Sequence, residues 1–319
     1  MKRRSLLSLL ALPAVATAQE RTVRIGGGLA AEAPQYAVAL ERGLFREAGV
    51  NPAVTNFPTG REAFEALVGG QLDVALMTEF PAVVGALRQQ RFGVMAVLSR
   101  YTGSRIIGRR RAGIGEGVAS LAGKKVGVTV GTNTHFMLAG ELAAAGVTAE
   151  IVNVGPADLV PTLVRGDVDA AATFPSFYAG ARRALGAEIV EIPVRSYQPT
   201  YLIAGSEAFL RGEGEAAQRL LRALLRGEAV ATGEVPAAQA AVGRVAGRAQ
   251  TADAIRENWN DYQVRTGLDD ALVALMQRQG AWLVERGAAR GAESKVALMR
   301  GAVADAPLRA VDAGRVSLS

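Results

Sequence analysis

The sequence predicts an α/β protein of two lobes, each with a mainly parallel sheet flanked by helices, joined by a hinge of two crossing segments. One pattern occurs twice: a helix ends at a glycine, and a strand with an aspartate at its start follows. The two copies are GGQLDVA at residues 69–75 and RGDVDAA at residues 165–171. Strands alternate with helices around each copy, which indicates parallel β-α-β units. The repeat therefore favours two lobes built on one plan.

The first lobe is expected to begin with alternating strands and helices. Pro34 opens the first helix, and Gly49 ends it. The segment after Asp73 is uniformly apolar, which is typical of a buried parallel strand. The expected strands are residues 22–28, 53–57, 73–77 and 94–98, and the expected helices are residues 34–48, 59–69 and 81–90.

The alternation restarts near residue 120 and predicts a second lobe. Its expected strands are residues 126–130, 149–154, 169–173 and 189–193, and its expected helices are residues 135–145, 157–165 and 175–185. The chain is expected to enter this lobe through residues 105–108 and to return through residues 200–204. Two extended crossings make a hinge, because few backbone dihedrals must change for the lobes to close. We therefore assign residues 19–104 and 205–319 to the first lobe and residues 105–204 to the second.

After Gly205 the chain becomes helical. Four amphipathic helices are expected to pack back on the first lobe, at residues 216–232, 236–246, 252–262 and 269–286. Residues beyond Ala302 show no strong period, so a loose tail is expected there.

Residues 1–18 have the pattern of a secretory signal peptide. Lys2, Arg3 and Arg4 form a basic start, residues 6–15 form a short apolar run, and ATA at residues 16–18 precedes the expected cleavage after Ala18. A bilayer span needs about 20 apolar residues, so this run is too short to be one. A buried first helix and export by the twin-arginine route are the alternatives. We expect a free periplasmic protein, because the absence of cysteine rules out a lipid anchor on that residue.

The composition excludes several classes of site. Without cysteine there is no disulfide, no thiolate nucleophile and no cysteine-bound metal. The only histidine is His135, so no metal site is expected. Apart from the three basic residues of the signal, 33 basic residues face 30 acidic ones. Their only cluster, Arg109-Arg110-Arg111, is interpreted as a solvated turn, and no nucleic-acid partner is expected.

Five stretches in a fixed order carry a family resemblance. They are ALERGLFREAG at residues 39–49, GGQLDV at 69–74, SLAGKKVGV at 120–128, GTNTH at 131–135 and RGDVDA at 165–170. Together they resemble the substrate-binding proteins of ABC importers in the nitrate, sulfonate, taurine and thiamine-precursor group, a branch of the type II periplasmic binding proteins. The resemblance covers residues 22–209. Two departures concern the ligand site: Phe174 stands where members often have tryptophan, and residues 28–34 lack the usual hydroxyl side chains.

The resemblance implies a small-molecule ligand in a cleft between the lobes and delivery to a membrane permease with its ATPase. It also implies a monomer that needs no cofactor. The rest of the site follows from a general rule: in open α/β lobes, ligands bind at the carboxyl ends of strands beside helix N-termini. Four loops of this chain meet that rule.

Three of these loops belong to the first lobe. Gly28 lets the backbone approach a ligand, or serves an ordinary tight turn. Thr59 is placed to cap the next helix, and Arg61 to reach an anion. Thr78 is a ligand donor or a cap, and Glu79 is an acceptor for a ligand N–H group or a charge that complements the helix dipole.

The fourth loop combines small polar side chains with a helix start and is the strongest candidate. Its expected ligand contacts are Gly131, Thr132, Asn133, Thr134 and His135, although a lone histidine is also often structural. Phe174 and Ser176 are expected to add an aromatic wall and a hydroxyl, and Tyr197 to reach the cleft from the returning crossing. No catalytic residue is expected.

Three classes of function fit these features. The leading hypothesis is a periplasmic solute-binding component of an ABC importer, with a sulfonate, taurine, nitrate or pyrimidine-like ligand. An enzyme on the same fold is the first alternative, but a desulfinase of this architecture uses a cysteine that is absent, and a pyrimidine synthase would consume His135 in the cytosol. A periplasmic ligand sensor for a membrane kinase is the second alternative.

Overall fold

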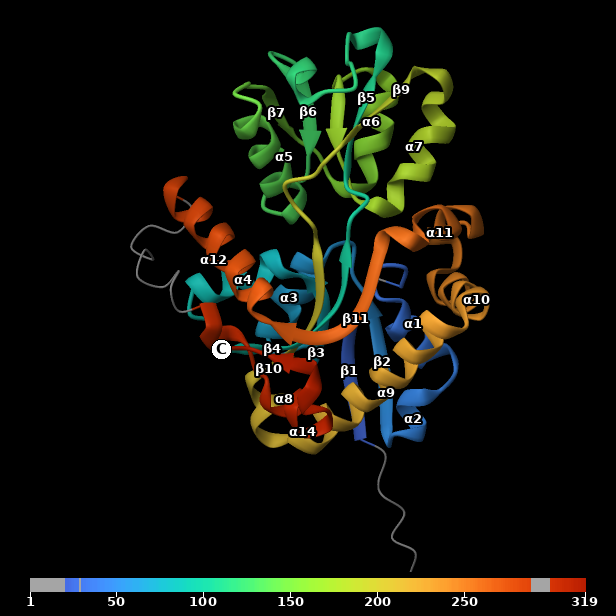
Figure 1. Ribbon diagram of the computed structural model, residues 1–319, viewed down its shortest axis with the longest axis vertical. Coiled ribbons are helices and arrows are strands. Elements are labelled where there is room, and N and C mark those ends of the chain that lie inside the picture. Colours follow the sequence, from blue (N-terminus) through green and yellow to red (C-terminus); the bar gives the residue numbers. More distant parts are fainter. Residues whose placement is uncertain (1–20, 29, 288–298) are drawn as a thin grey trace, which may run out of the picture.

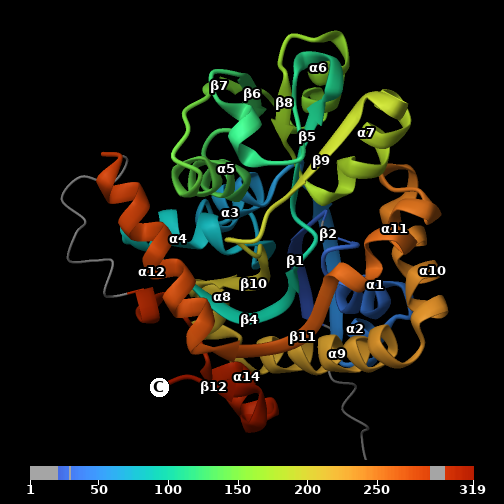
Figure 2. The same ribbon diagram turned by 45° about the horizontal axis from the view of Figure 1, so that its top comes forward.

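The computed structural model describes residues 21–28, 30–287 and 299–319. The expected signal peptide, including its cleavage point after Ala18, lies outside these residues. Two sheets flanked by helices stand one above the other and form two lobes (Figures 1 and 2). This is the two-lobed α/β architecture predicted from the sequence.

The sheet of the first lobe has seven strands. Their order is β12 (Val316–Ser317), β11 (Tyr262–Asp269), β4 (Phe92–Tyr101), β10 (Thr200–Ser206), β3 (Val74–Thr78), β1 (Arg21–Gly27) and β2 (Val50–Asn56). The sheet of the second lobe has five strands, in the order β7 (Glu150–Asn153), β6 (Lys125–Val128), β8 (Ala170–Ala172), β5 (Arg105–Arg109) and β9 (Ile189–Pro193).

One plan underlies both sheets. The order β2-β1-β3-β10-β4 in the first lobe corresponds to β7-β6-β8-β5-β9 in the second. In each series the first three strands are parallel and the last two run antiparallel to their neighbours. The sheets are therefore mixed rather than mainly parallel, because each contains strands next to the interlobe crossings.

The two aspartates of the sequence repeat perform the same task. Asp73, just before β3, accepts a hydrogen bond from the backbone N–H of Arg24 on β1 at 2.8 Å. Asp169, just before β8, accepts one from the backbone N–H of Lys125 on β6 at 3.0 Å. Each carboxylate thus satisfies a strand donor at the edge of the parallel pairing, which explains why the motif recurs.

The crossings lie slightly earlier in the chain than expected. Residues 105–108 already belong to β5 of the second sheet, and residues 200–204 already belong to β10 of the first. The chain therefore crosses through residues 102–104 and 194–199. The return to the first sheet precedes Thr200, so the expected boundary at residue 204 is too late. The apolar pattern of β10 would suit a strand of either sheet. Its pairing with β3 and β4 assigns it to the sheet of the first lobe.

Helices pack against both sheets. Those of the first lobe are α1 (Pro34–Glu41), α2 (Leu44–Glu47), α3 (Gly60–Val68), α4 (Glu79–Leu87), α8 (Glu207–Gly212), α9 (Gly214–Gly233), α10 (Val235–Ala246), α11 (Ala252–Asn258), α12 (Asp270–Glu285) and α14 (Ala306–Val311). Those of the second lobe are α5 (Asn133–Ala144), α6 (Leu159–Arg165) and α7 (Tyr178–Leu185). Within the described ranges, no helix is long and apolar enough to span a bilayer.

Three local predictions were wrong. The helix expected at residues 34–48 is two helices, because Gly43 adopts a left-handed conformation with φ of 74° between α1 and α2. The helix expected at residues 252–262 ends at Asn258, and the chain continues into β11. The expected loose tail is folded: Leu308 of α14 is fully buried, and β12 pairs with β11. Elements this short are too brief to show a period in the sequence.

A close helix contact gives a stability prediction. Gly227 of α9 faces α1, and a Cβ there would lie 2.2 Å from the backbone oxygen of Gln35. Gly227→Ala should therefore lower the free energy of unfolding by about 1–3 kcal/mol, since backbone must move to admit the methyl group. Gly233→Ala in the same helix is the control, because a Cβ there meets nothing within 4 Å. Urea unfolding measures both variants, and equal stabilities would contradict the packing.

Candidate ligand site between the lobes

A cavity of about 280 Å³ lies between the two lobes. The first lobe contributes Gly27, Gly28, Glu32, Phe57, Pro58, Thr59, Gly60, Arg61, Leu76, Thr78, Pro81, Tyr201 and Gln250, and the second contributes Thr132, Asn133, Phe174, Ser176 and Phe177. Most of these residues follow the carboxyl ends of β1, β2, β3, β6 and β8. The cavity is thus where parallel strands of both sheets end, as the general rule for α/β folds requires.

The structure places the expected ligand contacts in two groups. Lining the cavity are Gly28, Thr59, Arg61, Thr78, Thr132, Asn133, Phe174 and Ser176. Outside the lining are Glu79, Gly131, Thr134, His135 and Tyr197. Glu79, Gly131, Thr134 and His135 lie within two residues of the lining in sequence, and Tyr197 lies four residues before Tyr201. The side chains of Glu79, Thr134, His135 and Tyr197 make contacts within the protein.

Two helix N-termini open at the cavity. Thr59 caps α3, where its hydroxyl accepts the N–H of Glu62 at 3.3 Å. Thr132 precedes α5, and its hydroxyl donates to the carbonyl of Thr129 at 2.7 Å and lies 2.8 Å from the hydroxyl of Thr134. The Thr132 hydroxyl is used within the protein, whereas the Thr59 hydroxyl accepts a hydrogen bond and keeps its own proton to donate. The two helix starts also offer a ligand their free backbone N–H groups and dipoles, which favour an anionic group.

Thr78 differs from the other threonines. It stands at the N-cap of α4, but its hydroxyl makes no capping hydrogen bond. It lines the cavity together with Arg61 and Asn133. Phe174 and Phe177 add an apolar wall from the second lobe, with ring centroids 6.5 Å apart. The lining thus combines a few polar groups with aromatic surface, as small-molecule sites usually do.

Glu79 is a buried structural acceptor. Its side chain is 0% exposed, and its carboxyl accepts the Tyr197 hydroxyl, the Thr200 N–H at 2.9 Å and the Gln279 amide at 2.6 Å. Burial raises the pKa of Glu79, while these donors oppose the shift. The carboxyl joins the start of α4, the returning crossing and α12, and it lies outside the cavity lining.

His135 belongs to an aromatic cluster that joins α5 of the second lobe to α12. Its ring lies 5.3 Å from that of Trp282, which also contacts Phe136 at 5.4 Å and Phe80 at 6.1 Å. Burial, and secondarily the charge of Arg286, lowers the pKa of His135. The histidine is therefore part of an interlobe packing contact rather than of the cavity wall.

Glu32 was not predicted from the sequence. This residue lines the cavity, its side chain is 4% exposed, and its Oε2 atom has no hydrogen-bond partner. Burial raises the pKa of its carboxyl to about 7, against the opposing effect of the Glu32 and Ala31 N–H groups. One sequence feature could have indicated Glu32: it is the single acidic residue of the loop that follows β1. Only Gly28 of this loop was predicted to contact the ligand.

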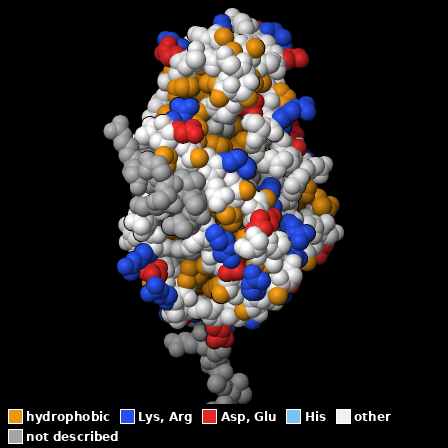
Figure 3. All heavy atoms as spheres, turned by 60° about the vertical axis from the view of Figure 1, so that its left-hand side comes forward, with side chains coloured by type: hydrophobic (Ala, Val, Ile, Leu, Met, Phe, Trp, Pro, Cys, Tyr) orange, Lys and Arg blue, Asp and Glu red, His pale blue; other side chains and the backbone are white. Residues whose placement is uncertain are grey.

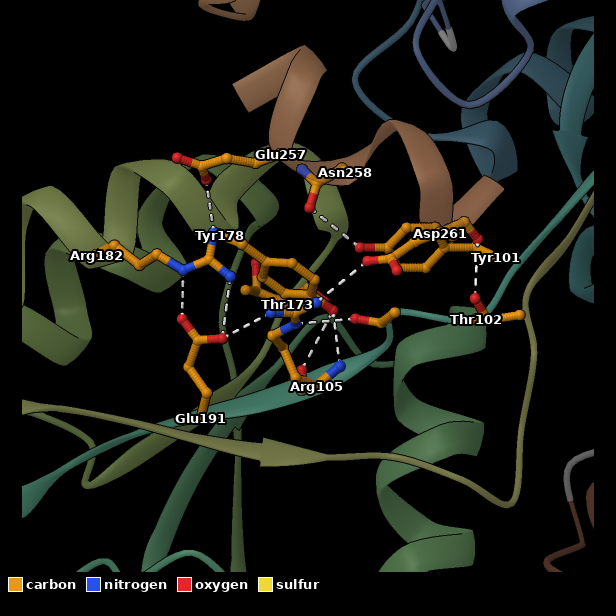
Figure 4. A network of polar contacts seen from close by, with 11 residues as sticks. Tyr101, Thr102, Arg105, Thr173, Tyr178, Arg182, Glu191, Glu257, Asn258 and Asp261 are labelled. Carbon is orange, nitrogen blue, oxygen red and sulfur yellow. Dashed lines mark hydrogen bonds and ion pairs between the residues drawn. The ribbon is translucent and has the colours of Figure 1, made fainter. Parts of the chain in front are cut away.

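On the hinge side, a polar network connects the lobes (Figure 4). Arg105 of β5 pairs with Glu191 of its own sheet at 2.7 Å and reaches Asp261 of the first lobe at 3.3 Å. Arg182 of α7 pairs with Glu257 of α11 at 2.7 Å. The network holds α11 against the second lobe beside the crossing at residues 102–104.

A metal centre is not supported by the geometry. Among residues 21–28, 30–287 and 299–319, no three histidine, aspartate or glutamate side chains are grouped so that they would hold an ion.

Comparison with known proteins decides the family. The family model described as NMT1/THI5 like matches residues 32–237. The chain belongs to this family. Among curated relatives, a protein of Brucella abortus (strain 2308) named as a binding protein is 28% identical over 184 residues, which is 54% of each chain. The taurine-binding periplasmic protein of Escherichia coli K12 is 27% identical over 173 residues, 53% of this chain and 52% of the relative. The chain spans about half the length of these curated relatives.

Solved structures show the same fold. The aliphatic sulphonate-binding protein SsuA of Escherichia coli superposes with a TM-score of 0.74 at 18% identity and covers 89% of this chain and 97% of its own. The nitrate-binding protein NrtA of Synechocystis PCC 6803 has a TM-score of 0.74 at 13% identity, covering 93% and 89%. The desulfurization enzyme DSZB has a TM-score of 0.64 at 16% identity, covering 91% and 98%. These three proteins share the fold of this chain, although their names give different functions.

The hinge-side network predicts a shift in lobe closure. The double variant Glu257→Gln with Asp261→Asn should favour open conformations of the unliganded protein, because each partly exposed ion pair is worth about 0.2–1 kcal/mol. Small-angle X-ray scattering should show a larger radius of gyration. Asp253→Asn is the control, since Asp253 pairs with Arg256 on the same helix, α11. Identical scattering of double variant and wild type would exclude a role in closure.

The buried Glu32 predicts a pH-dependent stability. Its folded-state pKa of about 7 exceeds the ordinary 4.5, so the folded state holds the proton more tightly than the unfolded chain. The resulting cost is absent below about pH 4.5, grows up to about pH 7 and is constant above it. Glu32→Gln should therefore gain stability over wild type as pH rises, by about 1.4 kcal/mol per unit of pKa shift.

Urea unfolding at pH 4.5, 6 and 7.5 measures this difference. The matched control is Glu150→Gln on β7, where the side chain is exposed. A difference between Glu32→Gln and wild type that stays constant across this range would show that the Glu32 carboxyl is not buried as described.

Proposed function

We propose that this protein is the periplasmic solute-binding component of an ABC importer. The observation that carries the proposal is the cavity between the lobes, built from the carboxyl ends of strands in both sheets. A ligand held there touches both lobes only when they are closed, so its binding free energy favours closure. Reversible binding with lobe movement is what a transport receptor requires. Among the lining residues that the structure describes, no side chains are arranged as a nucleophile with its base.

The ligand class follows from the size and lining of the cavity. About 280 Å³ admits a small organic molecule, and the helix N-termini of α3 and α5 favour an anionic group. Similar proteins are named as binding taurine, sulphonates or nitrate, which supports a sulfonate, taurine or nitrate ligand. A pyrimidine-like ligand is the remaining candidate of this size. Permease and ATPase subunits would be the protein partners of a monomeric receptor without a lipid anchor.

The visible charges give no support to a nucleic-acid role. On the face drawn in Figure 3, basic and acidic side chains are interspersed, without an extended basic patch. Electrostatic binding of a phosphate backbone requires such a patch.

A relative with enzymatic activity supplies the second candidate. DSZB shares the fold, so an enzyme on this scaffold is a specific alternative. The chain has no cysteine for thiolate chemistry, and His135 lies outside the cavity lining. A sensor that presents the bound solute to a membrane kinase would use the same cavity and would differ only in its partner.

The proposal is tested by a ligand screen on the protein beginning at Gln19. Thermal shift is measured with taurine, alkylsulfonates, nitrate, aminopyrimidines, small carboxylates and aromatic acids. A ligand at 100 times its dissociation constant adds about 2.7 kcal/mol to stability. A hit confirmed by calorimetry, with closure seen in scattering and no turnover, is the expected outcome. Turnover would favour the enzyme, and a silent panel with no ligand released on unfolding would contradict a solute-binding role.

A single hydroxyl tests where the ligand lies. Thr78→Val removes a cavity hydroxyl at nearly constant volume, and should weaken the binding of the confirmed ligand about tenfold, since a hydrogen bond to a charged group is worth about 1.5–3 kcal/mol. Isothermal titration calorimetry measures the change. Thr148→Val is the control, because Thr148 is exposed in the second lobe. Unchanged affinity in Thr78→Val would place the ligand elsewhere.

A further inference from the structure

The cavity contains one buried carboxyl that the protein itself leaves unsatisfied. Oε2 of Glu32 is buried and has no hydrogen-bond partner, although the residue faces the cavity. A buried polar atom without a partner is costly, so such an atom at a ligand site is expected to be paired when the ligand is present. The backbone of Glu32, by contrast, is fixed in position, because its carbonyl accepts a hydrogen bond from the Ser99 hydroxyl.

The charges of the lining are few and opposite in sign. Glu32 and Arg61 are the only charged side chains among the described residues that line the cavity. Arg61 is half exposed on α3 and pairs with Glu65 at 3.0 Å, so it does not neutralise Glu32 inside the cavity. A simple anion would meet the favourable N-termini of α3 and α5 but would also meet the carboxyl of Glu32.

The two buried carboxyls Glu32 and Glu79 differ in their hydrogen-bond partners. Both carboxyls are buried in the first lobe, but Glu79 receives three hydrogen bonds from Tyr197, Thr200 and Gln279. The carboxyl of Glu32 is stabilised only by backbone hydrogen bonds from the N–H groups of Glu32 and Ala31. One carboxyl is thus completed by the fold and the other is incomplete. A hydrogen-bonding group that enters the cavity from outside would complete the Glu32 carboxyl.

We propose that Glu32 binds a cationic nitrogen of the ligand, so that the site selects small zwitterions over simple anions of the same size. This inference rests on the proposed solute-binding function. The ammonium or amidinium group lies against Oε2 of Glu32, while the anionic end is held by the N-termini of α3 and α5 and by Arg61. A charge-assisted hydrogen bond of this kind is about twice as strong as a neutral one.

The protonation state of Glu32 distinguishes two modes of binding: an ionised carboxyl that accepts from a cation, and a neutral carboxyl that donates to an anion. Because burial raises the pKa of the free carboxyl to about 7, binding of a cation requires a proton to leave, and affinity should rise with pH. If a neutral Glu32 instead donated its proton to an anionic ligand, affinity should fall with pH. The direction of the profile separates the two.

Other titratable groups near Glu32 do not contribute to the pH dependence of affinity near neutrality. Tyr201 of β10 and Tyr262 of β11 sense the Glu32 charge, but burial raises their pKa values well above the usual range, so neither ionises near neutrality. The other charged side chain of the lining is a guanidinium, a group that is not deprotonated in proteins over this pH range. His135 lies outside the lining, and burial lowers its pKa from 6.5. A rise in affinity between pH 6.5 and 8 therefore reports Glu32.

The experiment uses probe pairs that differ only by an amino group. Taurine is compared with ethanesulfonate, and β-alanine with propionate, by calorimetry at pH 5.5, 6.5, 7.5 and 8. Each probe keeps its ionic form over this range. We expect the aminated member of at least one pair to bind at least tenfold more tightly at pH 8, and to lose about tenfold in affinity for each pH unit well below 7.

Glu32→Gln keeps the shape of the side chain and removes its charge. It should reduce the preference for the aminated probe to less than threefold and flatten the pH profile, while Glu150→Gln on β7 leaves both unchanged. If Glu32→Gln does not fold, the wild-type pH profile still decides the question.

The outcomes separate this inference from the proposed function. Equal affinity within each pair, tighter binding of the non-aminated members or a profile that falls with pH would overturn the role of Glu32 and leave a solute receptor intact. No binding of either aminated probe also counts against the inference. The proposed function itself fails only if the wider ligand panel is silent as well.

Discussion

The buried carboxyl of Glu79 is the interaction on which the arrangement of this protein depends. It accepts hydrogen bonds from Tyr197 and Thr200, at the end of the returning crossing, and from Gln279 of α12. Glu79 is also the first residue of α4 and directly follows Thr78, which lines the cavity. Tyr197, one of these donors, packs against Phe136 of the second lobe at 5.5 Å. A buried carboxyl is costly without hydrogen bonds, so these three donors hold α4, the returning crossing and α12 together. The cavity wall at Thr78 is fixed with them.

The two sheets explain why the cavity lies between the lobes. In each, three parallel strands end at the same edge, and loops that follow them face the opposite lobe. The repeated aspartates Asp73 and Asp169 hold the start of these strands in both lobes. The antiparallel strands β5 and β10 adjoin the crossings, so the chain passes between lobes twice at their centre. On the hinge side, the network of Arg105 and Arg182 with α11 adds contacts that can break as the lobes move.

Much of the site prediction followed from a rule about strand ends, and the loops that this rule selected line the cavity between the lobes. Thr59, Thr78, Asn133 and Phe174 line the cavity as their positions in those loops suggested. The choice of individual side chains was less secure, because adjacent residues in a turn point in different directions. Glu79 was chosen for its charge, yet it turns into the protein, whereas Glu32 faces the cavity from the loop after β1.

The sequence by itself determined the α/β class, the two-lobed plan and the family, because helix ends, apolar strands and the repeated aspartates are local patterns. It did not determine the strands β11 and β12, the break at Gly43 or the folded C-terminus, because these depend on pairing and packing with distant segments. It also could not distinguish the two carboxyls. Only the tertiary structure decides that Glu79 meets Gln279, 200 residues away in the chain, and that Oε2 of Glu32 has no hydrogen-bond partner. Side-chain partners are set by contacts across the chain, and no local pattern encodes them.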